Sequence, residues 1–239
     1  MRLARSGGEK ACCEPLPLNP QTSYLSISRR FFCNNLNIAP PPVWLTRHGE
    51  SEFNVQGRIG GDSGLSPRGI SYSHRLAAFF NNLYPKDASE LVVWTSTLRR
   101  THMTAAGLGR EIVAWKALDE IDAGVCDGMT YETIAATMPD EYAARAKSKY
   151  SYRYPRGESY QDMAQRLEPI IIELMRQRTP VLIVSHQATL RVLYAYILGR
   201  DPQTCPDVLM PLHSVIEIKQ HAYGAEEQRH ELLAGVGTH

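Results

Sequence analysis

No apolar run in this 239-residue sequence approaches the roughly 18 residues that a helix needs to cross a bilayer. Neither sign of charge is in excess, because 26 Lys and Arg residues are balanced by 25 Asp and Glu residues. No overall field therefore favours nucleic acid or an acidic membrane. The first residues also lack the apolar segment of a secretory signal. We expect neither nucleic-acid nor membrane partners, and we expect any selectivity for an anion to come from a local group of residues.

Cysteine pairs with metal-ligand spacing are also absent. The five cysteines are scattered, apart from one adjacent pair: Cys12, Cys13, Cys33, Cys126 and Cys205. An odd, scattered set is typical of reduced thiols in a cytosol-like compartment. The sequence therefore predicts a cytoplasmic protein that uses neither a metal nor another cofactor.

Residues 1–40 differ from the rest and end at a triproline, Pro40 to Pro42, which disfavours both helix and ladder pairing. After it, short apolar runs alternate with helical patterns. Strands are predicted over residues 43–46, 91–95, 112–115, 181–185 and 215–218, and helices over 66–83, 99–108, 159–178 and 189–198, with another starting at 131. Nearly all-apolar strands that alternate with helices predict a three-layer α/β/α sandwich with a mostly parallel central sheet. We interpret residues 41–223 as this domain and residues 224–239 as a flexible tail.

Two histidines each follow a buried-strand pattern. His48 comes after the first apolar run with Arg47 beside it, and His186 comes directly after residues 181–185. In open α/β sheets, ligands bind where strands end at their carboxyl edge. A guanidinium is a planar donor fork that fits phosphate, and a neutral imidazole can attack phosphorus. The pattern predicts phosphoryl transfer with His48 as the nucleophile.

Two further residues extend this candidate site. Arg100 follows the strand that ends near Thr95, and Glu120 opens a glycine-containing loop after the 112–115 strand. Glu120 is the candidate acid for a departing alcohol and then the base that activates water. Each residue alone is more often structural, and only their combination favours a site. The other histidines lack this setting and are predicted to be surface or structural: His74, His102, His213, His221, His230 and His239.

The segment from Arg47 to Asn54, Arg-His-Gly-Glu-Ser-Glu-Phe-Asn, resembles the signature of the histidine phosphatase superfamily, also called phosphoglycerate-mutase-like. Longer segments resemble the fructose-2,6-bisphosphatase half of the bifunctional 6-phosphofructo-2-kinase/fructose-2,6-bisphosphatases. They are residues 57–66, 94–96, 115–126, 129–131, 152–160, 165–169, 186–188 and 211–213. The likeness covers about residues 43–223 and implies a phosphoglycerate-mutase-like fold.

The resemblance also implies an activity, the hydrolysis of fructose 2,6-bisphosphate to fructose 6-phosphate and phosphate. By it, His48 becomes phosphohistidine, Glu120 is the acid and base, and His186 stabilises the transition state. The residues implied to hold the 2-phosphate are Arg47, Asn54 and Arg100. Those implied to bind the rest of the substrate are Gly60, Tyr131, Arg145, Lys149, Arg153, Gln187 and Arg191. The spacing of Arg145, Lys149 and Arg153 would form one basic stripe on a helix, with a solvated surface face as the alternative.

The chain also departs from the family. It lacks the phosphate-binding Gly-x-x-x-x-Gly-Lys-Ser/Thr loop of the kinase half. Residues 22–42 nevertheless faintly resemble the end of that half. Residues 1–40 are therefore interpreted as an extension or the remnant of a connector. Two rival functions stay open: a broad phosphatase or phosphoglycerate mutase of the same superfamily, and a non-catalytic module that binds a sugar phosphate. The sequence leaves the oligomeric state open.

Overall fold

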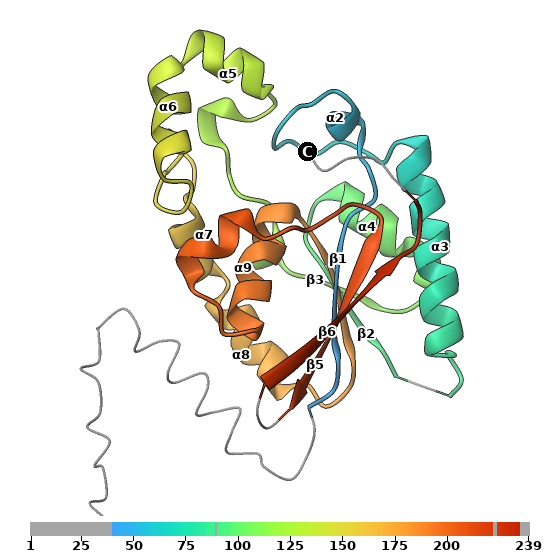
Figure 1. Cartoon of the computed structure of the whole chain (residues 1–239). Helices are drawn as coiled ribbons and strands as arrows, with labels where there is room; N and C mark the ends of the chain where they lie inside the picture. Colours follow the sequence, from blue (N-terminus) through green and yellow to red (C-terminus); the bar gives the residue numbers. More distant parts are fainter. Residues whose placement is uncertain (1–39, 89, 222–223, 235–239) are drawn as a thin grey trace, which may run out of the picture.

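Six strands form one mixed sheet in the order β3-β2-β4-β1-β5-β6 in the computed structural model, which describes residues 40–88, 90–221 and 224–234 (Figure 1). The strands are β1 (Val43–Arg47), β2 (Val92–Thr95), β3 (Ile112–Ala114), β4 (Val181–Ser185), β5 (Ser214–His221) and β6 (Gly224–Glu231). The first four are mutually parallel, and β5 and β6 are antiparallel to their neighbours. The predicted α/β fold is confirmed, with all five predicted strands present. The predicted extension before Pro40 lies outside the described residues.

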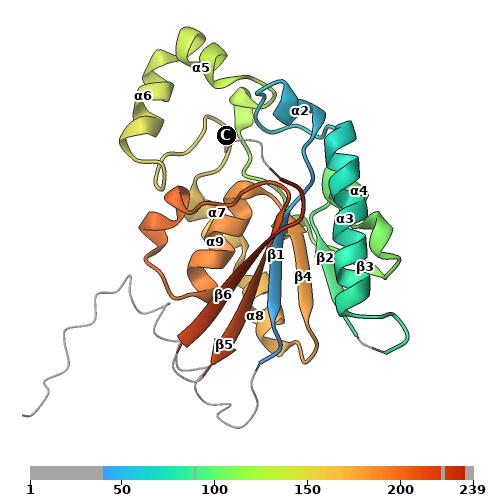
Figure 2. The ribbon, with the colours of Figure 1, turned by 45° about the vertical axis from the view of Figure 1, so that its right-hand side comes forward.

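Alternate residues of the central strands face opposite layers of helices. On β1, Val43 and Leu45 belong to one apolar cluster, and Trp44 belongs to the other. The cluster of Val43 includes residues of α7 (Tyr160–Arg166), α8 (Glu168–Arg176) and α9 (Gln187–Ile197). The cluster of Trp44 includes residues of α3 (Pro67–Leu83) and α4 (Arg99–Ala105). Both faces of the sheet are therefore covered, as Figure 2 shows, and every residue of β1 and β4 is buried for this reason.

Short elements lie beyond the carboxyl ends of the parallel strands. Helices α5 (Tyr131–Thr137) and α6 (Pro139–Lys147) project there on one side and α2 (Glu52–Val55) on the other (Figures 1 and 2). The 3-10 segments of the connections are η2 (Ala106–Leu108), η3 (Lys116–Leu118), η4 (Gly124–Cys126) and η5 (Pro202–Asp207). This edge of the sheet is where ligands bind in open α/β folds. Within the described residues, no helix is both long and apolar enough to cross a membrane.

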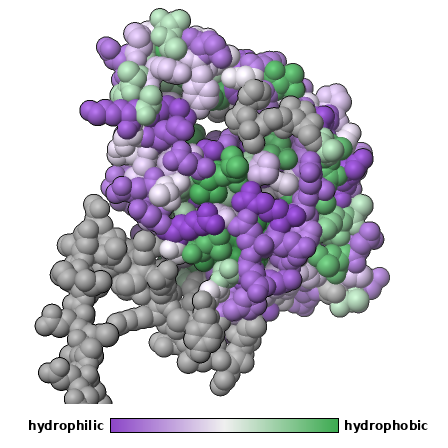
Figure 3. All heavy atoms as spheres, in the orientation of Figure 1, coloured by the Kyte–Doolittle hydropathy of each residue, from purple (hydrophilic) through white to green (hydrophobic). Residues whose placement is uncertain are grey.

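The flexible tail predicted from residue 224 is wrong for residues 224–231. These residues form β6 and pair with β5 along their whole length. The strand carries mostly charged and exposed side chains, and it lies on a largely hydrophilic face of the molecule (Figure 3). An edge strand is held by backbone hydrogen bonds from one neighbour and needs no apolar pattern, and charge on it discourages pairing with other chains.

The single helix predicted over residues 159–178 is also wrong, because it is divided into α7 and α8 at Leu167. Pro169 lies in the first turn of α8 and has no N–H for the hydrogen bond that would continue α7. The predicted start is confirmed. Ser159 and Asp162 form a capping box, in which the Ser159 hydroxyl accepts from the Asp162 N–H at 3.1 Å.

Candidate active site

His48 and His186 lie side by side at the ends of neighbouring parallel strands. Arg47 of β1 is in register with Ser185 of β4, and the backbone N–H of His48 donates to the Ser185 carbonyl at 2.9 Å. Adjacent strands are separated by about 4.8 Å, and the two imidazole centroids are accordingly 5.1 Å apart. Both rings are buried, at 3% and 0% exposure. The structure therefore brings together the two histidines that the strand-end pattern selected.

The His48 ring is held neutral, with one nitrogen available. Its Nδ1 lies 2.7 Å from the Gly49 carbonyl oxygen, which can only accept, so Nδ1 carries the hydrogen and Nε2 carries the lone pair. Burial lowers the pKa of His48 well below its usual value, and the charges of Arg100 and Arg47 lower it further. A neutral imidazole with a free Nε2 is the form that can attack phosphorus.

His186 presents a nitrogen without a partner. Its Nε2 lies 2.7 Å from the Ser96 hydroxyl, which is itself 2.9 Å from the Thr101 hydroxyl. Its Nδ1 is buried and has no hydrogen-bond partner among the described residues. Burial lowers the pKa of His186, and the nearby Arg100 contributes to the shift. Because a buried polar atom is normally satisfied, this nitrogen marks a position where a bound ligand can make the missing contact.

Two guanidinium groups are buried near the histidines. Arg47 donates from Nη1 to the Met210 carbonyl at 3.0 Å, and Arg100 donates from Nη1 to the Gly61 carbonyl at 2.7 Å. They are 7% and 4% exposed, and neither forms an ion pair within the described residues. Burial lowers the pKa of Arg47 to about 10 and also lowers the pKa of Arg100. Buried positive charge without a carboxylate partner is suited to an anion.

Glu120 joins this group from the loop after η3. Its Oε1 accepts hydrogen bonds from the N–H groups of Ile121 at 3.0 Å and Ala188 at 3.2 Å. Ala188 lies just after His186 in the first turn of α9. The negative charge of Glu120 opposes the lowering of the pKa of Arg47 and Arg100 by burial, so the carboxylate lies within electrostatic reach of both. The five residues predicted to do the chemistry are thus gathered at one edge of the sheet.

Helix α2 contributes Asn54, and the loop after it contributes Gly60. The Asn54 carbonyl oxygen accepts from the N–H and hydroxyl of Ser51, so its NH2 group is the part left to contact a ligand. Gly60 and Gly61 have φ angles of 69° and 62°, which favour glycine. The Gly61 N–H donates to Asp127 at 2.8 Å while the Gly61 carbonyl accepts from Arg100. This loop therefore supports one of the buried arginines.

Four residues predicted to bind the rest of the substrate lie at the same edge. Arg191 donates from Nε to the Val208 carbonyl at 2.8 Å and from Nη1 to the Tyr160 hydroxyl at 3.2 Å. Gln187 is half-buried directly after His186. Arg145 bridges the hydroxyls of Tyr154 at 2.8 Å and Tyr131 at 2.9 Å, and its guanidinium lies 4.7 Å from the Tyr131 ring centroid.

The basic stripe predicted from Arg145, Lys149 and Arg153 does not form. Helix α6 ends at Lys147, and beyond it Lys149 pairs with Asp207 at 3.7 Å and Arg153 pairs with Asp162. The tyrosines on either side of Arg153 explain why the helix does not continue. Tyr152 and Tyr154 pack edge-to-face in a small apolar cluster with residues of η4 and α5, and this burial takes the chain out of the helix.

Several residues that support the site were not identified from the sequence. The Thr104 hydroxyl accepts from the Gly49 N–H at 2.9 Å, and His213 Nε2 accepts from the Glu50 N–H at 3.2 Å. The sequence predicted that His213 is surface or structural; it is buried, so of these two only the structural role fits this contact. Ser96, which contacts His186, belongs to a sequence segment that resembled the family, whereas nothing local marked Thr104. Among the described residues, no group of His, Cys, Asp and Glu could hold a metal ion, and the absence of a cofactor stays a prediction.

Comparison with known proteins identifies relatives of the whole domain. The chain is 51% identical over 219 residues to a 6-phosphofructo-2-kinase/fructose-2,6-bisphosphatase of Arabidopsis thaliana, covering 91% of this chain and 29% of that protein. It is 48% identical over 210 residues to the human 6-phosphofructo-2-kinase/fructose-2,6-bisphosphatase 1, covering 87% of this chain and 44% of that protein. The chain thus spans less than half the length of these curated relatives.

Solved structures show the same fold at low identity. The α-ribazole phosphatase of Shigella flexneri superposes with a TM-score of 0.70 and 24% identity, covering 82% of this chain and 100% of that one. A mycobacterial glucosyl-3-phosphoglycerate phosphatase gives a TM-score of 0.67 and 24% identity, covering 79% and 97%. The model of the histidine phosphatase superfamily (branch 1) matches residues 43–232, which confirms the resemblance predicted from the sequence. The chain belongs to the histidine phosphatase superfamily.

Proposed function

We propose that this protein hydrolyses fructose 2,6-bisphosphate at its 2-phosphate and releases fructose 6-phosphate and phosphate. The observation that carries the proposal is the pair of neutral, buried imidazoles with centroids 5.1 Å apart, close to the buried guanidinium groups of Arg47 and Arg100. The substrate is favoured by the 48–51% identity to the bifunctional relatives named above. The sugar bisphosphate would be the small-molecule partner, and a cytosolic location is part of the same proposal.

In the first step, Nε2 of His48 attacks the 2-phosphate and the bond between phosphorus and the sugar oxygen breaks. Glu120 gives its proton to that oxygen, so fructose 6-phosphate leaves as a neutral alcohol at this position. Arg47 and Arg100 neutralise charge on the equatorial oxygens, which is the main requirement of phosphoryl transfer. The NH2 group of Asn54 adds a donor, and Nδ1 of His186 lies where its missing partner would be a phosphate oxygen.

In the second step, Glu120 accepts a proton from water and the oxygen of that water attacks the phosphohistidine. The bond between phosphorus and Nε2 then breaks, and His48 returns to its neutral form with phosphate released. The hydrogen bond from His48 Nδ1 to the Gly49 carbonyl keeps the ring oriented through both steps. Besides burial, the charges of Arg100 and Arg47 lower the pKa of His186. A bound dianionic phosphate opposes this lowering and so stabilises the protonated form of His186 in the complex.

The rest of the substrate would be held by Gly60, Gln187, Tyr131 and basic residues at the same edge. Arg145 and Arg191 are already oriented by tyrosine hydroxyls. Lys149 and Arg153 have side chains that are 45% and 64% exposed, and each is paired with a carboxylate. Exposed ion pairs contribute little to stability. A 6-phosphate dianion can therefore compete for both side chains, and this exchange would bring them to the substrate.

The decisive experiment measures phosphate release from a panel: fructose 2,6-bisphosphate, fructose 6-phosphate, 3-phosphoglycerate and p-nitrophenyl phosphate. We expect a strong preference for fructose 2,6-bisphosphate, and replacement of Arg145, Lys149 and Arg153 by Met should raise its KM. Equal rates across the panel and an unchanged KM in the triple variant would favour a broad phosphatase. Phosphoryl transfer between phosphoglycerates with a bisphosphoglycerate primer would identify a mutase. Tight binding without release would point to a non-catalytic module.

A further inference from the structure

Arg166, the last residue of α7, hydrogen-bonds the backbone of the segment that carries Glu120. Its Nη1 donates to the carbonyl oxygens of Ala117 at 2.8 Å and Asp119 at 3.1 Å. Its Nη2 donates to the Asp119 carbonyl at 3.2 Å and reaches the Glu120 carbonyl at 3.5 Å. One guanidinium thus engages the backbone on the N-terminal side of Glu120 and at Glu120 itself.

Glu158 fixes the orientation of this guanidinium. It accepts from Arg166 Nε at 2.9 Å and from Nη2 at 3.0 Å, which is the bidentate geometry of a strong carboxylate–guanidinium pair. The same carboxylate accepts from the Asp122 N–H at 3.1 Å. The two side chains are 22% and 25% exposed, so the pair is more shielded than a typical surface ion pair. The backbone is therefore tied to one ion pair on both sides of Glu120.

Two hydroxyls, one from β4 and one from α9, hold the same segment independently of Arg166. Ser185, which precedes His186, donates to the Leu118 carbonyl at 2.7 Å, and Thr189 of α9 donates to the Asp119 carbonyl at 2.7 Å. The Glu120 side chain reaches the Ala188 N–H, one residue from Thr189. The segment is thus fixed relative to the strand and helix that present His186.

We propose that Arg166, oriented by Glu158, is a positioning residue for Glu120 in proton transfer; this inference rests on the proposed function. Arg166 need not touch substrate, because its donors are committed to backbone carbonyls and to Glu158. A general acid must lie within hydrogen-bond distance of the leaving oxygen, and a displacement of about 1 Å can cost about a hundredfold in rate. A lysine would keep the charge of Arg166 but cannot reproduce the planar set of hydrogen bonds.

A double-mutant cycle on kcat for fructose 2,6-bisphosphate tests this role. Arg166→Lys should lower kcat about 10- to 100-fold with KM within about threefold of the wild-type value. In a Glu120→Gln background, where the acid is already absent, it should lower kcat less than about twofold. Thr189→Val, an isosteric change that removes one donor to the Asp119 carbonyl, should show the same pattern with a smaller effect. Arg176→Lys is the matched control on α8, because its only ion pair in the described structure is with Glu173.

Equal losses from Arg166→Lys in the wild-type and Glu120→Gln backgrounds, or no loss in either, would overturn the positioning role. If Arg166→Lys does not fold by circular dichroism, Thr189→Val completes the same cycle and decides the question. The proposed function fails in a distinguishable way. In that case the wild-type protein would release no phosphate from fructose 2,6-bisphosphate, or Glu120→Gln would be fully active, and the positioning role would fall with it.

Discussion

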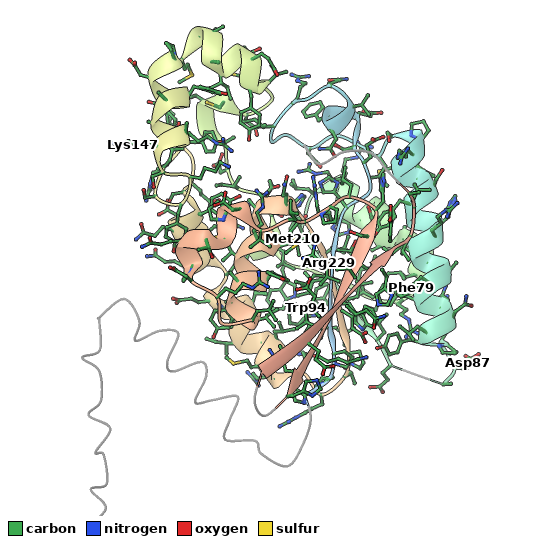
Figure 4. The ribbon with its side chains drawn as sticks, in the orientation of Figure 1. Phe79, Asp87, Trp94, Lys147, Met210 and Arg229 are labelled. Carbon is green, nitrogen blue, oxygen red and sulfur yellow. The ribbon has the colours of Figure 1, made fainter. Side chains whose placement is uncertain are left out.

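Arg47 and Arg191 donate hydrogen bonds to carbonyl oxygens two residues apart, those of Met210 and Val208, at 3.0 and 2.8 Å. The carbonyl between them, that of Leu209, accepts from Arg229 of β6 at 3.0 Å. Figure 4 labels Met210 and Arg229, which lie near each other at this segment. Residues 208–210 therefore connect an arginine proposed for the reacting phosphate, an arginine proposed for the far end of the substrate, and the edge strand of the sheet.

Replacing Arg229 with Ala should lower the activity, although Arg229 is not one of the residues proposed for the site. The change also removes the pair of Arg229 with Glu227 on β6, but only its hydrogen bond to the Leu209 carbonyl reaches residues 208–210. Loss of that bond is worth about 0.5–1.5 kcal/mol, so we expect kcat/KM for fructose 2,6-bisphosphate to fall about 3- to 10-fold. Steady-state kinetics measures this. Glu226→Ala on the same strand is the control, since Glu226 is exposed and pairs with His221 at the strand end. An Arg229→Ala protein as active as the control would contradict the prediction.

Labelling should identify His48 as the residue that carries the phosphoryl group. Substrate labelled at the 2-phosphate should give a protein-bound phosphate that survives alkali and is lost in acid, as expected of phosphohistidine. His48→Ala should give no label, and its kcat should fall about a thousandfold or more because the two-step route is lost. His74→Ala, at an exposed position of α3, should label normally. Normal labelling of His48→Ala would rule out this nucleophile.

Stability should decrease as the pH falls from 6.5 towards 5. Burial lowers the pKa of His48 and of His186 below the ordinary value near 6.5, so below that pH the unfolded chain binds protons that the folded protein does not. Each site then contributes a loss of up to about 1.4 kcal/mol per pH unit. Urea unfolding between pH 5 and 8 measures it. His48→Asn should give a shallower slope, and a wild-type stability that rises on acidification would contradict the prediction.

Substitutions at two glycines of the loop after α2 can distinguish the effect of backbone strain from the effect of a disturbed site. Gly57 and Gly60 have φ angles of 68° and 69°, so an alanine at either position costs about 1 kcal/mol or more of stability. At Gly57 an added Cβ meets nothing within 4 Å, whereas at Gly60 it would lie 1.6 Å from Asp127 Oδ1. Asp127 would have to leave the Gly61 N–H, and Gly61 supplies the carbonyl partner of Arg100.

We therefore expect Gly60→Ala to lower kcat about tenfold and Gly57→Ala to leave kcat unchanged, although both lower the melting temperature. Thermal unfolding and steady-state kinetics on the two variants distinguish the effects. Equal kcat values would show that the contact between Asp127 and Gly61 does not influence Arg100.

Local patterns were sufficient for five of the six strands, and they selected the residues proposed to do the chemistry. Apolar runs that each lead to a histidine predicted β1 and β4 correctly, because a strand covered on both faces is apolar at most of its positions. The same logic failed for β6, whose pairing depends on backbone groups that every residue has. It also failed beyond α6, where spacing suggested a helix but burial of Tyr152 and Tyr154 decided the path.

Residue type and short-range periodicity were enough to select the side chains proposed for the reaction and to predict the strands that deliver His48 and His186. The fold of the whole domain makes β1 and β4 neighbours in register, so that His48 and His186 meet. It alone decided that Lys149 and Arg153 pair with Asp207 and Asp162, and that Arg166 engages the backbone of the Glu120 segment. These contacts join segments far apart in the chain, and their geometry depends on the packing of the whole domain, which no local pattern records.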